Sequence, residues 1–244
     1  MSNIITRTLT YTTADGVTLE SYLCLPVQTS LELSGVLVAP EWWGLSDFAK
    51  QSAGRLAEAG YAALAMDLYG NARLTDDAQQ AQTWMEEVLS SPLTLAERTE
   101  LALKALSTQE EVNPLSVGAI GFCFGGKVVL DMARRGVHLI AVASFHGILA
   151  PIAPAQEGII KAEILVEHGE QDTLVSMDDV AAFKQEMNAA KVQYTVDVFP
   201  NAKHGFTNPQ ATHNGEKNKA DLAYNEAAAS IAWQNMLNLL ERTL

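Results

Sequence analysis

Short apolar segments alternate with longer amphipathic segments along most of this chain. Apolar runs of strand length occupy residues 35–39, 61–66, 116–122, 139–145, 163–167 and 193–199. Apolar residues recur at helical spacing in residues 47–59, 77–89, 94–106, 126–135, 177–190 and 220–240. On the last of these helices we expect one side to carry Ile231, Met236, Leu237 and Leu240. This alternation predicts an α/β fold with a mostly parallel central sheet and helices on both faces.

Two β-rich segments precede this pattern. Residues 8–13 and 17–25 flank the turn sequence Ala-Asp-Gly at 14–16, which predicts an N-terminal β-hairpin. No repeat, low-complexity tract or Gly/Ser linker interrupts the chain, so we expect a single domain over residues 1–244. The polar stretch 71–77 and the loop 147–158 are expected to be irregular and to lie near a site.

Composition and charge narrow the classes of partner. The chain has 244 residues, of which 48% are hydrophobic and 18% charged, as in ordinary globular proteins. A net charge of −13 disfavours nucleic acid and anionic membranes as partners, because both repel an acidic surface. The longest apolar runs are too short to span a bilayer, and the first seven residues lack the apolar region of a secretion signal. We therefore expect a cytoplasmic protein.

The cysteines and histidines point away from disulfides and metal sites. The chain has two cysteines, Cys24 and Cys123, and five histidines. Cys24 lies in an apolar strand segment and is interpreted as a core residue. A reduced chain is the simpler interpretation of two cysteines, and the histidines show no metal-ligand spacing, so no metal or cofactor is predicted.

The strongest local motif is Gly-Phe-Cys-Phe-Gly-Gly at residues 121–126, between an apolar strand and an apolar helix. A sharp strand-to-helix turn of this kind needs glycines two residues to either side of the nucleophile to avoid a clash. It would hold Cys123 at a helix N-terminus, where the helix dipole favours a thiolate. The alternative is a glycine-rich packing turn with an inert, buried cysteine.

A nucleophilic thiol needs a base and an orienting carboxylate, in the chain order nucleophile, acid, histidine. Asp172 and His204 each follow a predicted strand downstream of Cys123, so we predict them as acid and base. Glu170 is the alternative acid, and His146 and His168 are alternative bases.

Acyl transfer also needs hydrogen-bond donors for the oxyanion. The backbone N–H of Phe124, directly after the nucleophile, is one predicted donor. The second is the N–H of Trp42, in the loop after the strand at 35–39. Trp43 is predicted either to contact substrate or to lie in the core.

Together these motifs resemble the dienelactone hydrolase family of the α/β-hydrolase fold, over most of the chain and in the family's order. The resemblance rests on Pro-Glu-Trp-Trp-Gly at 40–44, Gly-Tyr-Ala-Ala at 60–63, Asp-Leu-Tyr-Gly at 67–70, the motif at 121–126, Gly-Glu-Gln-Asp at 169–172 and His-Gly-Phe at 204–206. A cysteine in place of serine at this turn is characteristic of the family. The resemblance also implies that Glu41 contacts the resting thiol and helps convert it to thiolate.

The substrate-binding arginines of the founding enzymes of the dienelactone hydrolase family are not matched in this sequence. Those enzymes hold an anionic dienelactone with arginines, one of them a few residues after the histidine, whereas residues 205–209 here are Gly-Phe-Thr-Asn-Pro. Lys203, Asn208 and Arg73 are the residues that could contact a substrate carboxylate instead. The residues predicted to contact substrate are Trp43, Arg73, His146, Phe206 and Asn208.

The sequence therefore predicts a hydrolase that cleaves small carboxylic esters or lactones with Cys123, His204 and Asp172. Its partner would be the small-molecule substrate alone, or a second copy through the long last helix. Two alternatives come from other classes. One is a non-catalytic binding protein on the same fold. The other is a thiol redox enzyme, for which neither a Cys-x-x-Cys motif nor an obvious resolving cysteine is present.

Overall fold

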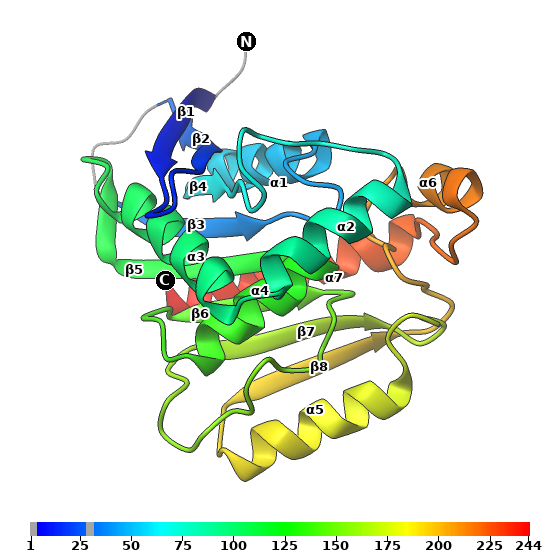
Figure 1. The fold of residues 1–244 in the computed structure, drawn as a ribbon. Coiled ribbons are helices and arrows are strands. Elements are labelled where there is room, and N and C mark those ends of the chain that lie inside the picture. Colours follow the sequence, from blue (N-terminus) through cyan, green and yellow to red (C-terminus); the bar gives the residue numbers. More distant parts are fainter. Residues whose placement is uncertain (1–3, 28–31) are drawn as a thin grey trace. The chain divides into compact units, whose positions relative to one another are not determined.

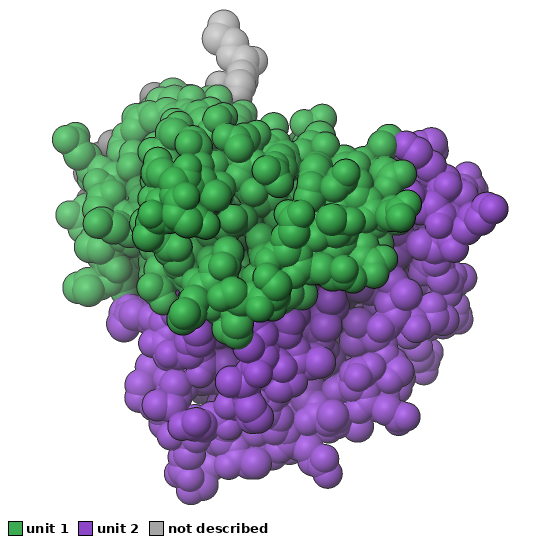
Figure 2. All heavy atoms as spheres, viewed as in Figure 1, with its two compact units in different colours: residues 1–119 green, residues 120–244 purple. Residues whose placement is uncertain are grey.

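The computed structural model describes residues 4–27 and 32–244, and three of the seven N-terminal residues considered above therefore lie outside the described residues. Two compact units make up the chain, Met1–Ala119 and Ile120–Leu244 (Figure 2). Within the described residues the chain forms eight strands and seven helices, labelled in Figure 1. They are β1 (Ile4–Thr12), β2 (Thr18–Pro26), β3 (Leu33–Ala39), α1 (Asp47–Glu58), β4 (Ala62–Ala65), α2 (Ala78–Leu89), α3 (Pro92–Ser107), β5 (Val112–Phe122), α4 (Phe124–Arg134), β6 (Ala141–Phe145), β7 (Glu163–Gly169), α5 (Met177–Ala189), β8 (Tyr194–Phe199), α6 (Ala211–Asn218) and α7 (Glu226–Thr243).

The first unit confirms the predicted N-terminal hairpin. Strands β1 and β2 pair antiparallel from Ile4 opposite Pro26 to Thr12 opposite Thr18. The turn is closed by the Thr13 N–H, which donates to the Val17 carbonyl at 3.0 Å, and Gly16 supplies the positive φ of +88°. Cys24 lies in β2 with no exposed surface, as its apolar neighbours indicate.

The remaining strands of the first unit follow the order β2-β4-β3, with β2 and β4 antiparallel and β3 and β4 parallel. Helix α1 packs on β2 and β4, and α3 packs on β3 and β4. Every residue of β4 is buried. A strand buried on both faces has the continuous apolar sequence that residues 61–66 show.

In the second unit, β6, β7 and β8 are neighbours and run parallel. Strand β5 begins in the first unit and ends in the second, where it runs directly into Cys123 and helix α4. Helix α4 packs on β6, and α7 packs on β6 and β7. Because parallel strands end at the same edge of a sheet, the segments after β6, β7 and β8 emerge together. These segments carry His146, Asp172 and His204.

The predicted α/β class is confirmed, since helices are interspersed among the strands from β3 onward and the strands from β6 to β8 are parallel. Residues 71–77 and 147–158 contain neither helix nor multi-residue strand, as expected. Among the described residues, no helix combines the length and the apolar character needed to cross a bilayer. The single-domain organisation stays a prediction.

Two details of the C-terminal region were predicted wrongly. Helix α6 was missed because it is polar, with Ala211 and Gly215 as its buried residues, and so shows no apolar stripe. The last helix begins at Glu226 rather than at residue 220, because the Asn225 side chain caps it by accepting from the Ala228 N–H at 3.1 Å.

Ile231 was expected on the apolar side of α7, but its side chain is 54% exposed. The buried face carries Ala228, Ala232, Met236, Leu239 and Leu240. Ile231 directly precedes Ala232, and one residue turns an α-helix by about 100°, so the larger side chain points away from that face.

Candidate functional site

Cys123 occupies the sharp turn between β5 and α4. Its backbone has φ +53° and ψ −115°, a strained conformation for a residue with a side chain. A Cβ on Gly121 would lie 2.1 Å from the Gly125 carbonyl oxygen, and one on Gly126 would lie 2.6 Å from the Gly147 Cα. Gly121 and Gly126 therefore require glycine, which accounts for two of the three glycines in the motif.

The two thiols have different surroundings. Both cysteines are free, but Cys123 is partly exposed at the N-cap position of α4, whereas Cys24 is buried in β2. Burial raises the pKa of the Cys24 thiol to about 11, so it stays protonated at neutral pH. Cys123 is thus the thiol that a small molecule can reach.

His204 is held by Asp172. His204 Nδ1 lies 2.8 Å from Asp172 Oδ2. The other carboxylate oxygen, Oδ1, accepts hydrogen bonds from the backbone N–H groups of Leu174 and Val175, each at 2.9 Å. These contacts fix the carboxylate from both ends, and so fix the imidazole. Glu170, the alternative acid, is exposed.

The charge state of His204 depends on its neighbours. Burial by itself lowers the pKa of this imidazole, which is 3% exposed. The negative charge of a Cys123 thiolate and the hydrogen bond to Asp172 outweigh burial and raise the pKa of His204 to about 10. Cys123 and His204 are therefore electrostatically coupled, as a thiolate and imidazolium would be.

The pKa values of the alternative bases, His146 and His168, are lowered, whereas the pKa of His204 is raised. Both alternative bases are fully buried. Burial lowers the pKa of His168, and it lowers the pKa of His146 well below 6.5, with the positive charge of His204 as a further cause. His204 is the histidine that pairs with a carboxylate at hydrogen-bond distance.

Three other predicted residues of the second unit, Phe124, Phe206 and Asn208, are buried. Each lies within four residues of Cys123 or His204 in the sequence. Phe124 is the first residue of α4, so its backbone N–H lies at the helix N-terminus. The Phe206 ring packs edge-on against His146, with centroids 5.4 Å apart. Asn208 Oδ1 accepts from the Gln210 N–H at 2.9 Å and so shapes the turn before α6. Lys203 forms an ion pair with Asp221 at 2.5 Å.

The predicted residues of the first unit gather around two loops that lie side by side. Trp42 and Trp43 contact each other edge to face, with centroids 5.0 Å apart, and Trp43 is buried. The Tyr69 hydroxyl donates to the Trp42 carbonyl at 3.0 Å. Glu41 is also buried in this loop, being 4% exposed.

Arg73 belongs to the second of these loops. Its carbonyl accepts from the Leu45 N–H at 3.1 Å, which ties the loop after β3 to the loop after β4. Its guanidinium lies over the Trp84 ring, 5.7 Å from the centroid, and 4.0 Å from a Glu87 carboxylate oxygen. The roles of Trp42 as an oxyanion donor, of Trp43 and Arg73 as substrate contacts and of Glu41 as a contact of the thiol stay predictions.

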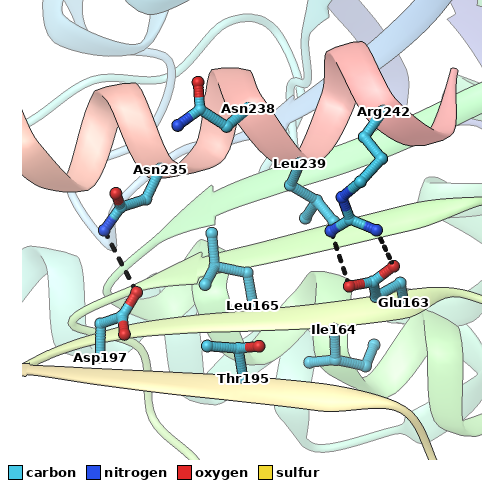
Figure 3. Close-up of a pocket in the computed structure, with 9 residues that line it drawn as sticks. All are labelled: Glu163, Ile164, Leu165, Thr195, Asp197, Asn235, Asn238, Leu239 and Arg242. Carbon is cyan, nitrogen blue, oxygen red and sulfur yellow. Dashed lines mark hydrogen bonds and ion pairs between the residues drawn. The ribbon is translucent and has the colours of Figure 1, made fainter.

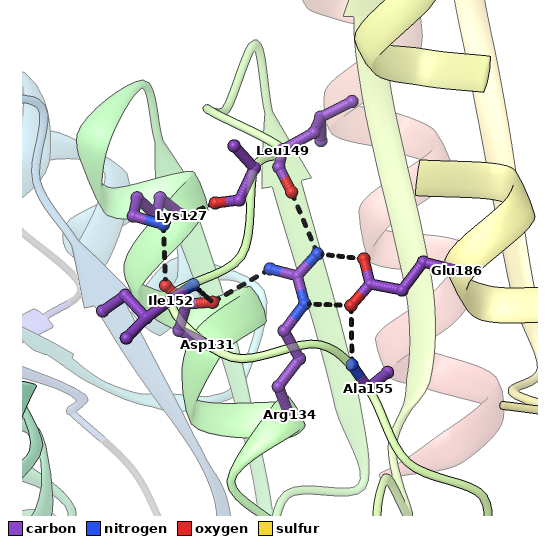
Figure 4. A network of polar contacts seen from close by, with 8 residues as sticks. Lys127, Asp131, Arg134, Leu149, Ile152, Ala155 and Glu186 are labelled. Atoms are coloured by element: carbon purple, nitrogen blue, oxygen red, sulfur yellow. Dashed lines mark hydrogen bonds and ion pairs between the residues drawn. The ribbon is translucent and has the colours of Figure 1, made fainter. Parts of the chain in front are cut away.

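A buried ion network fastens the loop that follows β6 (Figure 4). Arg134 of α4 makes a two-pronged ion pair with Glu186 of α5, at 3.0 and 2.7 Å, and donates to the Leu149 carbonyl at 2.9 Å. Glu186 in turn accepts from the Ala155 N–H at 2.7 Å. The predicted irregular loop is therefore held firmly to α4, the helix that follows Cys123.

A groove of about 220 Å³ lies elsewhere in the second unit, between α7 and the strands β7 and β8 (Figure 3). Its lining includes an Arg242–Glu163 ion pair at 2.7 and 2.8 Å and a bond from Asn235 to Asp197 at 3.1 Å. None of the predicted site residues lines this groove.

Sequence reasoning missed two residues that contact the predicted ones. Thr207 Oγ1 lies 2.7 Å from His146 Nε2, and Tyr69 holds the Trp42 carbonyl. The position of Thr207, three residues after His204, could have indicated that it lies near the base. Its contact with His146 could not have been predicted, since the two residues are 61 positions apart in the sequence.

Comparison with known proteins shows the family and the fold of this chain. The family model described as "Dienelactone hydrolase family" matches residues 19–244. The solved structure titled "m3DLH" is 36% identical, with a TM-score of 0.92 and 99% of each chain covered. A dienelactone hydrolase-like promiscuous phosphotriesterase from metagenomic libraries is 35% identical, with a TM-score of 0.91 and the same coverage. A Bradyrhizobium protein named "Probable 2-oxo-3-(5-oxofuran-2-ylidene)propanoate lactonase" is 27% identical, covering 89% of this chain and 86% of its own.

Proposed function

Because this chain belongs to the dienelactone hydrolase family, we propose that it hydrolyses small carboxylic esters or lactones with Cys123, His204 and Asp172. The observation that carries the proposal is the setting of His204: its Nδ1 lies 2.8 Å from Asp172 Oδ2, and the negative charge of a Cys123 thiolate raises the pKa of its imidazole. A lactonase name among the relatives supports the substrate class.

In the proposed reaction the Cys123 thiolate attacks the carbonyl carbon and the carbonyl electron pair moves onto oxygen. The backbone N–H of Phe124 would stabilise this oxyanion, and the proposal extends to the Trp42 N–H as a second donor. When the intermediate collapses, the C–O bond breaks and the departing alkoxide takes the proton from His204 Nε2. In a lactone that alkoxide stays attached to the acyl group.

The thioester is then hydrolysed. A water molecule gives a proton to neutral His204 and its oxygen adds to the thioester carbonyl. Collapse breaks the C–S bond, which restores the thiolate and the imidazolium and releases the carboxylic acid, and this acid then loses its proton to the solvent. Asp172 keeps the imidazole oriented in both halves of the reaction and stabilises its charged form. Glu41 enters the proposal as the residue that would hold the thiol in its resting state.

The direct test replaces Cys123 by alanine and uses p-nitrophenyl esters, neutral lactones and carboxylated enol-lactones as substrates. We expect Cys123→Ala to abolish turnover of whichever class the wild type cleaves, and mass spectrometry to find an acyl adduct on Cys123 and none on Cys24. Undiminished hydrolysis by the variant would remove the nucleophile assignment.

The same panel addresses the alternatives. A binding protein on this fold turns over none of the substrates, and a ligand that it binds raises its melting temperature. A thiol redox enzyme would consume peroxide, and would do so after His204→Ala.

A second candidate activity is phosphotriester hydrolysis. The observation that favours it is the 35% identity, over 99% of both chains, to a structure titled as a promiscuous phosphotriesterase. A thiolate that attacks a carbonyl can also attack phosphorus and expel an aryl oxide. Diethyl p-nitrophenyl phosphate is the test substrate, and the activity should disappear in Cys123→Ala.

A further inference from the structure

His146 has an unusual backbone and lies next to the proposed nucleophile. It follows β6 directly, is fully buried and has φ +39°, a left-handed conformation that is rare for a residue with a side chain. Its N–H donates to the Glu167 carbonyl of β7 at 2.8 Å, which holds this conformation in place. Strain of this kind persists only where the surrounding contacts enforce it.

The residues on either side of His146 contact the backbone of the nucleophile turn. The Phe145 carbonyl accepts from the Cys123 N–H at 3.0 Å, and the Ile148 N–H donates to the Cys123 carbonyl at 3.4 Å. Gly147 lies so close to Gly126 that a Cβ on it would be 2.9 Å from the Gly126 Cα. The segment 145–148 is thus fitted tightly to the turn that carries the thiol.

The side chain of His146 contacts a different loop, the one that carries the base. Its Nε2 lies 2.7 Å from Thr207 Oγ1. Its ring packs edge-on against the rings of His204 and Phe206, with centroids 5.3 and 5.4 Å apart. One residue therefore links the loop of the proposed base to the segment that holds the proposed nucleophile.

The charge of His146 suits this position. The pKa of His146 is lowered well below 6.5 by burial and by the neighbouring His204, while the pKa of His204 is raised to about 10. At neutral pH one ring is neutral and the other cationic, so the two pack without like-charge repulsion. His168 is the other titratable group acting on His146, and burial lowers its pKa too.

We infer that His146 is a positioning residue for the proposed hydrolysis: its contacts with Thr207 and with the His204 ring set the place of the base relative to the Cys123 turn. This inference rests on the proposed function. It assigns His146 no contact with substrate and no proton transfer. It differs from the sequence-based prediction, in which His146 lines the substrate pocket.

The test distinguishes the effect of the aromatic ring of His146 from the effect of its hydrogen bond to Thr207. His146→Phe keeps an aromatic ring and removes the bond to Thr207, while Thr207→Val removes the same bond from a half-buried position where folding is less at risk. We expect each variant to lower kcat for a lactone or alkyl ester by about 10- to 100-fold while KM changes less than about twofold. The double variant should be no worse than the worse single variant, because both remove one interaction.

Two further measurements complete the design. Iodoacetamide alkylates the thiolate, so the pH dependence of Cys123 alkylation reports the thiolate–imidazolium pair without any substrate, and the pH at which alkylation begins should rise in both variants. His146→Gln, which keeps a polar group near the position of Nε2, should restore part of kcat. His213→Phe, on the exposed surface of α6, is the matched control and should behave as wild type.

The inference is overturned if Thr207→Val keeps wild-type kcat and an unchanged alkylation profile, or if the two losses add in the double variant. Failure of the proposed function gives a different result. In that case Cys123→Ala keeps full turnover and His204→Ala leaves the alkylation profile of Cys123 unchanged.

Discussion

Two clusters of buried ionisable groups in the second unit respond to burial in opposite ways. His204 keeps its charge, because Cys123 and Asp172 outweigh burial and raise its pKa to about 10. Glu167 in β7 is also fully buried, but burial and the neighbouring Asp197 raise the pKa of its carboxyl to about 8, so it is neutral at pH 7. The charge state of a buried group therefore depends on the sign of its partners as well as on its burial.

The partners differ because of where the chain places them. Glu167 and Asp197 are opposite each other on the parallel strands β7 and β8, so both acids face the same side of the sheet. Asn235 of α7 donates to Asp197, and the Arg242 guanidinium is paired with Glu163. The acid in the other cluster, Asp172, accepts two backbone N–H bonds and lies 2.8 Å from the imidazole of His204.

The largest expected effect on turnover comes from removing the negative charge of Asp172, which pairs with the imidazole of His204. Asp172→Asn should lower kcat/KM for an ester or lactone by about 10³- to 10⁴-fold, because the imidazole loses both its orientation and the charge that stabilises its cationic form. The pKa of His204, followed by NMR, should fall in the same variant.

The matched control for that variant is Asp197→Asn, a carboxyl of the other cluster, which should leave turnover within about twofold of wild type. Equal losses of kcat/KM in Asp172→Asn and Asp197→Asn would contradict the distinction between the His204 cluster and the Glu167 cluster.

The next effect concerns stability. A carboxyl whose folded pKa is raised from 4.5 to about 8 stabilises the fold below pH 4.5, and this contribution is lost as the pH rises through 8. Glu167→Gln cannot ionise, so it should be more stable than wild type at pH 9 by about 1–3 kcal/mol and show a flatter dependence on pH. Urea unfolding at pH 5 and pH 9 measures both quantities.

Glu170→Gln, three residues away and exposed, is the control and should keep the wild-type slope. A wild-type slope in Glu167→Gln as well would mean that the buried carboxyl is not the group that titrates.

A smaller effect follows from the pKa of His204. A histidine with a raised pKa is cationic until the pH exceeds that value, so its proton is available to a leaving alkoxide up to about pH 10. Above it, kcat for a lactone should fall about tenfold per pH unit. A p-nitrophenyl ester should fall less, since its leaving group needs no proton, and identical profiles for the two substrates would argue against His204 as the acid.

The smallest effect is expected at the edge of the acid cluster. Arg242 and Glu163 form an exposed two-pronged ion pair, and pairs in water contribute little. Arg242→Ala should change Tm by less than about 2 °C at low salt and by less still at high salt. A larger change would show that the groove beneath α7 depends on this pair.

The periodicity of the chain was sufficient to predict most elements to within a few residues. It failed where a helix has no apolar stripe, as in α6, and where a side-chain cap moved a helix start, as at Asn225. Apolar spacing reports the faces that bury surface, so it cannot detect a polar helix held by its surroundings.

By itself, the sequence determined the strand–helix alternation, the glycine pattern around Cys123 and the order of Cys123, Asp172 and His204, because these depend on local geometry and on the direction of parallel strands. Only the tertiary structure decided which histidine pairs with Asp172, that His146 and Thr207 meet, and that Glu167 and Asp197 are opposed. Each of these is a contact between residues 30 or more positions apart. Packing of whole elements sets such contacts, and neither residue type nor local spacing encodes them.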